Sequence, residues 1–136
     1  MSFSHATRVR FGHVDAAGIV FYPRYFEMIN AAVEEWFAAV TGTSFAEFHG
    51  VRRLGLPTVQ MDCQFVAPSR LGELLDISVT LERCGTASCT LAYRLACLGV
   101  ERVKASAVLV CLDLDRGRAT PWPEDVRVGF ARMLAG

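Results

Sequence analysis

An acidic residue, Asp15, stands in a glycine-bearing turn just before a run of large apolar residues and a predicted helix. The stretch reads FGHVDAAGIVFYPRYF, from Phe11 to Phe26. A carboxylate can attack a carbonyl carbon or activate water as a general base. The first N–H groups of a helix lack intrahelical partners, and they can stabilise an oxyanion as it develops. Together these groups suit the hydrolysis of an activated acyl compound such as a thioester.

The residues between Asp15 and the helix fit this chemistry. Gly18 permits a sharp turn and lets a substrate come close to the backbone. Pro23 suits the first position of a helix, which places the N–H of Tyr22 at the helix start. The apolar run 19–22 then forms a wall that excludes water and packs an acyl group. The candidate substrate-binding residues are His13, Gly18, Ile19, Val20 and Phe21.

Simpler interpretations exist for the same residues. Taken alone, an aspartate before a helix most often caps it or stabilises a turn. His13 is a poor start for a metal site, because the sequence holds only His5 and His49 besides it, so a hydrogen bond within the turn is its simpler role. We therefore predict no metal and no cofactor. Ser69 lacks the G-x-S-x-G elbow typical of many serine hydrolases.

The elements that position these residues can be predicted from the spacing of apolar side chains. From Arg24 to Val40, apolar residues recur at intervals of three and four residues. This spacing predicts an amphipathic helix that ends at Thr41-Gly42. Ser44 to Glu47 has the spacing of a capping box and predicts a short second helix. Strands are predicted at 7–11, 59–65, 75–81, 89–97 and 100–114, and a terminal helix or tail at 124–134.

One long helix with an aromatic face needs a broad apolar sheet to cover it. The four later strands are joined by short turns and are therefore antiparallel. We predict an α+β fold in which a curled antiparallel sheet wraps around one long central helix. Residues 1–136 contain no linker or repeat, and we interpret them as a single domain.

Composition limits the partners and the compartment. The formal charge is +0, which does not favour a nucleic-acid partner or an anionic membrane. The hydrophobic fraction of 52% favours an oligomer that buries apolar surface between subunits. Five cysteines without a CxxC pair favour a reducing cytoplasm. The longest apolar stretch, at 107–112, is too short to span a membrane.

The run FGHVDAAGIVFYPRYF resembles the signature of the 4-hydroxybenzoyl-CoA thioesterase family of hotdog-fold enzymes, F-G-[DH]-x-D-x-x-G-[IV]-V-[FYW]-[YF]-P-x-Y. The downstream LPTVQMDCQFVAPSRLGELLDISV is similar to the second strand, loop and third strand of that family, so the resemblance covers nearly the whole chain. It implies a hotdog fold, with Asp15 as base or nucleophile and the backbone N–H of Tyr22 as the group that polarises the thioester carbonyl. His13 and Val14 replace the commoner Asp and Cys, and Ala16 replaces a frequent Pro, which suggests a different substrate pocket.

Three functions stay open at this point. The first is an acyl-CoA thioesterase that acts on aromatic, benzoyl-like or short acyl groups, because the bulky wall favours a compact acyl group. The second is a hotdog hydratase or dehydratase, which would need a His and an acid from across a subunit interface. The third is a non-catalytic acyl-thioester binding protein. The expected partner is an acyl-CoA, and we expect a homodimer as the building unit of a homotetramer.

Overall fold

The computed structural model describes residues 2–136. In chain order, its elements are β1 (Ser2–Arg8), the 3-10 turn η1 (Phe11–His13), α1 (Pro23–Thr41), the π-helical η2 (Ala46–Val51), β2 (Leu54–Gly55), β3 (Thr58–Phe65), β4 (Leu74–Cys84), β5 (Ser88–Cys97), β6 (Val100–Val110), β7 (Leu112–Asp113), β8 (Arg118–Ala119) and α2 (Glu124–Ala135).

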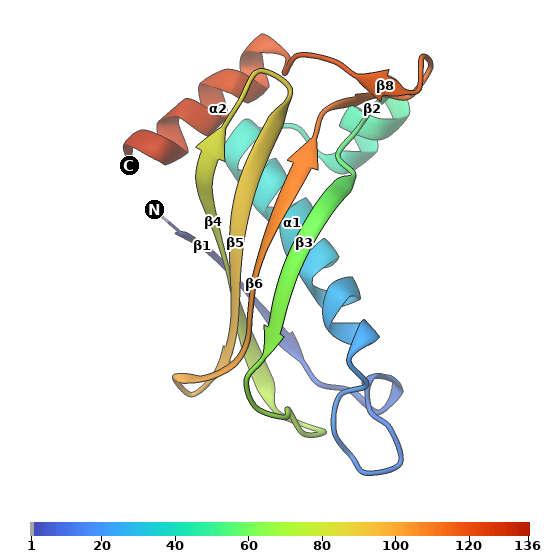
Figure 1. Ribbon diagram of the computed structural model, residues 1–136, viewed down its shortest axis with the longest axis vertical. Coiled ribbons are helices and arrows are strands. Elements are labelled where there is room, and N and C mark those ends of the chain that lie inside the picture. Colours follow the sequence, from blue (N-terminus) through green and yellow to red (C-terminus); the bar gives the residue numbers. More distant parts are fainter. Residues whose placement is uncertain (1) are drawn as a thin grey trace.

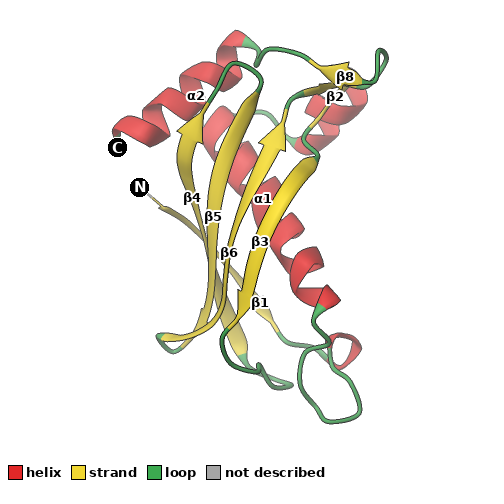
Figure 2. Ribbon diagram, viewed as in Figure 1, coloured by secondary structure: helices red, strands yellow, loops and turns green. Residues whose placement is uncertain are grey.

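Five long strands form one antiparallel sheet in the order β1-β4-β5-β6-β3. The sheet curls along one side of α1, as Figures 1 and 2 show. The short strands β2, β7 and β8 form a second small sheet. The strand β3 pairs with β6 alone, so its other edge has no strand beside it among residues 2–136. The predicted curled sheet around one long helix is confirmed.

The helix α1 begins and ends where its sequence predicts. Pro23 occupies its first turn, and Gly42 follows it with a left-handed φ of 74°. The N–H of Gly42 donates to the carbonyl of Ala38, which satisfies one of the last free carbonyls of the helix. One face packs on the sheet, and its buried residues are Tyr25, Met28, Ile29, Ala32, Val33, Trp36 and Phe37.

The end of the molecule farther from Asp15 holds an aromatic cluster between α1 and α2. Trp36 stacks on Phe130 at a centroid distance of 5.5 Å, and Trp122 meets the same ring edge-on at 5.0 Å. The indole N–H of Trp36 contacts the sulfur of Met133 at 2.9 Å. In Figure 1, α2 lies at the upper end of the sheet, while the loop before α1 lies at the lower end.

Two predicted strands differ from the observed ones. The first strand spans 2–8 rather than 7–11, because residues 11–13 form a 3-10 turn instead. The strand predicted at 100–114 is interrupted at Cys111, where the N–H bonds to the carbonyl of Ala87 and β7 then leaves for the small sheet. The terminal helix, the short second helix and the three remaining strands are confirmed.

Candidate active site

Residues 13–15 and 19–21 form a short two-stranded ribbon, which we call the Asp15 loop (residues 13–21). The N–H of Asp15 donates to the carbonyl of Ile19 at 2.9 Å, and the N–H of Gly18 donates to the carbonyl of Asp15 at 3.0 Å. Tyr22, just before the first residue of α1, is three positions after Ile19, which is at most about 10 Å of extended chain. The ribbon therefore keeps Asp15 and the helix start at the same end of the molecule.

The carboxylate of Asp15 uses its two oxygens differently. Oδ1 accepts a hydrogen bond from the N–H of Ala17 at 2.8 Å, which is the geometry of an Asx turn. Within residues 2–136, Oδ2 has no hydrogen-bond partner, and the side chain is exposed. The simple role of a turn residue is thus present, and one oxygen remains free for chemistry.

Gly18 owes its place to backbone conformation rather than to packing. Its φ is +79°, in the region that residues with a side chain rarely adopt. A Cβ at this position would have no atom of residues 2–136 within 4 Å. The predicted sharp turn is therefore present, and open space lies beside it.

Tyr22 offers a free backbone donor at the opening of α1. Pro23 has no N–H, and the N–H groups of Arg24 and Tyr25 donate to the carbonyls of Phe21 and Tyr22 at 2.9 and 3.1 Å. The N–H of Tyr22 has no hydrogen-bond partner in the part of the chain that the structure describes. Of these opening positions, only Tyr22 can therefore donate to a substrate oxygen.

His13 takes part in its own turn. Its Nδ1 accepts a hydrogen bond from the N–H of Arg10 at 2.8 Å. Because Nδ1 acts as the acceptor, a neutral imidazole carries its proton on Nε2. His13 is half-buried, and its Nε2 is the atom left for a substrate.

The apolar run before the helix is divided between the core and the surface. Val20 is 7% exposed and belongs to the core, whereas the side chain of Phe21 is 49% exposed. Ile19 is half-buried. This alternation follows from the extended backbone, in which successive side chains point to opposite faces. In one copy of the chain, the residues of the run that remain accessible to a substrate are therefore Ile19, Phe21 and Tyr22, which is 57% exposed.

A second loop, residues 66–73 between β3 and β4, supports the Asp15 loop; we call it the platform loop. The N–H of Val20 donates to the carbonyl of Ser69 at 2.9 Å, and the N–H of Leu71 donates to the carbonyl of Gly18 at 3.1 Å. Both loops lie at the lower end of the molecule in Figure 1. The sequence does not predict this support, because an irregular loop has no periodic pattern and nothing in the pattern around Ser69 indicates a contact with the Asp15 loop.

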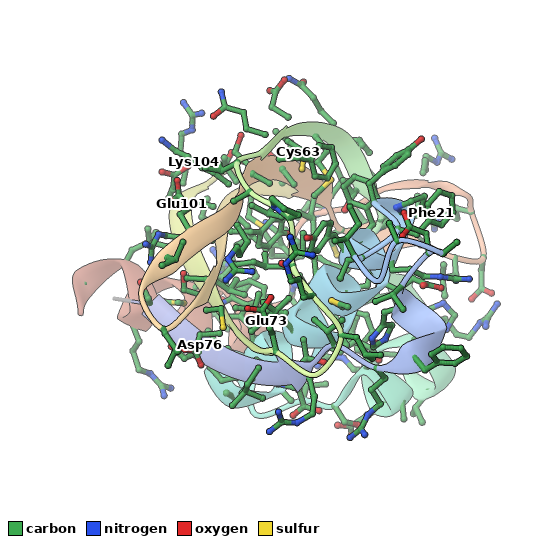
Figure 3. The ribbon with its side chains drawn as sticks, turned by 90° about the horizontal axis from the view of Figure 1, so that it is seen from below. Phe21, Cys63, Glu73, Asp76, Glu101 and Lys104 are labelled. Atoms are coloured by element: carbon green, nitrogen blue, oxygen red, sulfur yellow. The ribbon has the colours of Figure 1, made fainter. Side chains whose placement is uncertain are left out.

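An ion pair fixes the platform loop to the sheet. The guanidinium of Arg102 donates to both carboxylate oxygens of Glu73, at 2.7 and 3.1 Å, and to the carbonyl of Pro68 at 2.8 Å. The hydrogen bond from Arg102, and a second from the N–H of Arg70, lower the pKa of Glu73 from 4.5 to about 2. Figure 3, viewed from below, places Glu73 near the middle of this end and Phe21 to its right.

Aromatic side chains connect the helix start to the end of β3. The ring of Phe65 lies 5.7 Å from that of Tyr22 and 6.0 Å from that of Tyr25, measured between centroids. Phe65 and Tyr22 are 50% and 57% exposed. An apolar surface therefore continues from the helix start onto the uncovered edge of the sheet.

The best-formed pockets of the single chain lie away from Asp15. Three of them are described on the surface of residues 2–136, and none of these three is lined by Asp15 or Tyr22. One of them, which we call the groove, lies between α1, η2 and the start of β3 and measures about 470 Å³. Its lining residues are Asn30, Val33, Glu34, Phe45, His49, Leu56, Pro57, Thr58 and Leu109.

Three further observations concern metals, thiols and membranes. Among the described residues, no group of three or more His, Cys, Asp or Glu side chains could hold a metal ion. The five cysteines are free thiols. No helix within residues 2–136 is both long enough and apolar enough to cross a bilayer.

Comparison with known proteins gives one family and several relatives. The model of a family described as the thioesterase-like superfamily matches residues 9–130. A 1,4-dihydroxy-2-naphthoyl-CoA hydrolase of Nostoc punctiforme is 26% identical over 126 residues, which cover 93% of this chain and 84% of that protein.

Solved structures show the same architecture. A gentisyl-coenzyme A thioesterase superposes with a TM-score of 0.84 at 26% identity, and the match covers 94% of this chain and 99% of that one. A mutant 4-hydroxybenzoyl-CoA thioesterase in complex with 4-hydroxybenzoyl-CoA superposes with a TM-score of 0.85 at 24% identity, covering 94% and 97%. These matches confirm the predicted hotdog fold and the resemblance to hotdog thioesterases.

Proposed function

The chain belongs to the thioesterase-like superfamily, and we propose that it is an acyl-CoA thioesterase, which hydrolyses its substrate to a free acid and coenzyme A. One observation carries the proposal. Within residues 2–136, the backbone N–H of Tyr22 is the only donor left free at the opening of α1, and a carboxylate with one unengaged oxygen lies on the ribbon that leads to it.

In this proposal, Tyr22 stabilises the thioester oxygen, and Asp15 supplies the nucleophile or the base. The N–H of Tyr22 donates to the thioester carbonyl, and it does so more strongly as negative charge develops on the oxygen. Asp15 Oδ2 attacks the carbonyl carbon, or it removes a proton from the water that attacks. The tetrahedral intermediate then expels the thiolate of coenzyme A. When water is the nucleophile, this step gives the free acid directly; when Asp15 is the nucleophile, it leaves an acyl–aspartyl anhydride, which a water opens to release the acid and restore Asp15. No metal or cofactor is needed for these steps.

We further propose that the complete site forms between two copies of the chain. The uncovered edge of β3 presents free backbone groups, and Val59 and Phe65 on this strand are 59% and 50% exposed. An exposed apolar edge strand is a natural place for a second copy to add its own β3. We propose this dimer as the building unit and a homotetramer as the assembly.

In the proposed dimer, the groove of the second copy would serve as the pocket for the acyl group. A two-fold axis through β3 pairs the two strands antiparallel, so Phe65 lies toward Thr58 of the partner subunit. The groove of the second copy, which begins at Thr58, then lies near Tyr22 of the first. The acyl group would occupy that groove, while the thioester lies between Asp15 and Tyr22.

The groove is suited to a compact ring that bears a hydroxyl group. Five of its nine lining residues are apolar, and Asn30 and Thr58, both exposed, can hydrogen-bond a substituent. Glu34, which also lines it, would repel a second carboxylate on the acyl group. We therefore propose benzoyl-type or short acyl-CoA substrates over palmitoyl-CoA and succinyl-CoA.

One observation favours a second candidate function. His49 and Glu34 line the same groove, and a histidine with an acid is what a hydratase or dehydratase of this fold would need for proton transfer. In this alternative, the groove itself is the site of the chemistry and Asp15 is only a turn residue. The two functions therefore depend on different residues.

A panel of acyl-CoAs tests the proposal. Hydrolysis releases a free thiol that Ellman's reagent detects, whereas hydration of an enoyl-CoA removes its ultraviolet absorbance without releasing thiol. We expect thiol release, fastest with benzoyl-type or short acyl-CoA. Palmitoyl-CoA or succinyl-CoA cleaved at least about tenfold more efficiently in kcat/KM would overturn the pocket argument. Absence of thiol release from every acyl-CoA would overturn the thioesterase itself.

The compartment is also a proposal. The free thiols of all five cysteines, three of them buried, agree with a reducing environment. We propose that the protein acts in the cytoplasm on an acyl-CoA, without a nucleic-acid or membrane partner.

A further inference from the structure

Ser69 contacts the chain on both sides of Tyr22. Its backbone carbonyl accepts the N–H of Val20, two residues before Tyr22, at 2.9 Å. Its side-chain Oγ accepts the hydroxyl of Tyr25, three residues after Tyr22, at 2.9 Å. The segment that carries the proposed oxyanion donor is therefore held at both of its ends by one residue.

Both side chains of this contact are buried. Ser69 is 0% exposed and Tyr25 is 4% exposed. No buried side-chain nitrogen or oxygen among the described residues lacks a hydrogen-bond partner, so the Tyr25–Ser69 bond belongs to a fully paired interior. A hydrogen bond that is shielded from water in this way has few alternative geometries, and it fixes the direction of the groups it joins.

The platform loop that carries Ser69 is itself immobilised. Arg102 donates to the carbonyl of Pro68, the residue before Ser69, and to the carboxylate of Glu73. The N–H groups of Val66 and Ala67 both point to the carbonyl of Arg102, at 2.8 and 3.3 Å. The residues on both sides of Ser69 are thus bonded to β6, so Ser69 can act as a fixed reference for the helix start.

We propose that Tyr25 and Ser69 are positioning residues for thioester turnover, which aim the backbone N–H of Tyr22 at the substrate oxygen. This inference rests on the proposed function. Neither side chain touches the reacting atoms; both act through the backbone of Tyr22. Since Pro23 follows Tyr22 directly, the chain on that side is already restricted, and the Tyr25–Ser69 bond supplies the remaining restraint.

The test uses two single variants and the double variant. Tyr25→Phe and Ser69→Ala each leave one buried hydroxyl unpaired, whereas Tyr25→Phe/Ser69→Ala removes both partners together. Leaving one partner unpaired is destabilising, and removing both is close to neutral. Thermal stability should therefore fall in each single variant and recover in the double variant. Tyr93→Phe, on β5, is the matched control, because it removes one hydroxyl from a tyrosine that is 3% exposed.

Kinetics separate positioning from simple stabilisation. We expect kcat to fall by about tenfold or more in both single variants and to stay low in the double variant, with KM within about threefold, because a small misplacement of a catalytic group is costly even when binding survives. Tyr93→Phe should keep its kcat. Recovery of kcat together with stability in the double variant would overturn the inference.

Hydrogen exchange tests the same contact without an enzyme assay. Peptides that span residues 17–24 should exchange faster in Tyr25→Phe than in the wild type, while peptides from β5 should not change. Unaltered exchange at 17–24 would overturn the inference whatever the activity. If the wild type released no thiol from any acyl-CoA, the proposed function would fail, and the exchange result would still decide whether Ser69 restrains the helix start.

Discussion

At the scale of single residues, the structural and the catalytic interpretations of Asp15 turn out to be compatible. The sequence presented them as alternatives, since a turn aspartate and a catalytic aspartate look the same in a pattern. In the structure, one oxygen stabilises the turn and the other is free. The turn bond could be predicted from the Asp15-x-Ala17 spacing, whereas the free N–H of Tyr22 required the partners of its neighbours to be known.

Replacement of Asp15 by Asn tests the catalytic role with little structural change. Asn retains the Oδ1 acceptor for the N–H of Ala17, so the turn should survive. We expect Asp15→Asn to lower kcat by about a hundredfold or more, because the base or nucleophile is lost. Asp76→Asn, an exposed change on β4, is the control. A near-native kcat in Asp15→Asn, measured by thiol release, would remove Asp15 from the mechanism.

The ionisation of Glu73 gives a prediction in pH. Arg102 lowers the pKa of Glu73 from 4.5 to about 2, so folding favours the ionised carboxylate. Its stabilising effect is therefore complete above pH 4.5 and is lost as the pH falls toward about 2. We expect Glu73→Gln to be less stable than the wild type at neutral pH, with a difference that shrinks below pH 4.5. Urea unfolding of both proteins at several pH values measures this difference in stability.

The exposed Glu82, on β4, provides the control for that series. Glu82→Gln should keep about the stability of the wild type at neutral pH, because Glu82 is exposed and takes no part in the ion pair that Arg102 makes with Glu73. If the gap between Glu73→Gln and the wild type were the same at pH 3 and pH 7, the ion pair would not be the source of the stability.

At the scale of elements, prediction succeeded where one face of an element is apolar and regular. The helix α1 and the strands β3, β4 and β5 alternate clearly between apolar and polar positions, and their limits were close to the observed ones. The first strand was misplaced because Ser2–Arg8 has mostly small or polar residues, and its pairing with β4 decides its place. The platform loop was out of reach, since Tyr25 and Ser69 are 44 residues apart.

The crossing of α1 and α2 depends on one glycine. A Cβ at Gly129 would collide with the backbone carbonyl of Val40 and approach the Cα of Thr41 to 3.2 Å. We expect Gly129→Ala to lower the free energy of unfolding by about 1–3 kcal/mol, although alanine favours a helix, because overpacking outweighs propensity. Chemical denaturation measures the loss.

Val128→Ala provides the matched change on the exposed side of the same helix. Val128 is 41% exposed, so its truncation should have a small effect on the free energy of unfolding. Equal stability of Gly129→Ala and the wild type would show that the two helices can separate without cost.

At the scale of the whole molecule, the predicted α+β hotdog fold is confirmed, and the chain belongs to the predicted superfamily. The site residues, the acyl group and the assembly stay predictions, because each depends on the surface that we propose a second copy of the chain to complete. The uncovered edge of β3 and the exposed ring of Phe65 lie where the proposed second copy would bind. The fold can be predicted from apolar patterns within the chain. The pocket cannot, because in our proposal it depends on a second copy.

The mass in solution tests the proposed assembly. We expect light scattering at micromolar concentration to give a multiple of 14.9 kDa, with two copies as the smallest active unit. Val59→Lys places a charge on the open edge of β3 and should shift the mass toward one copy and lower the activity with it. A fully active single copy would contradict a site shared between subunits.

Because the Asx turn leaves one oxygen of Asp15 free to attack, isotope labelling can test whether Asp15 is the nucleophile. The N–H of Ala17 holds Oδ1, so an attack on an acyl carbon would come from Oδ2. If an acyl–aspartyl anhydride forms and water opens it at the aspartyl carbon, turnover in ¹⁸O-water would leave heavy oxygen in the peptide that contains Asp15. Mass spectrometry of that peptide would then identify a covalent intermediate, which no comparison of rates alone can do.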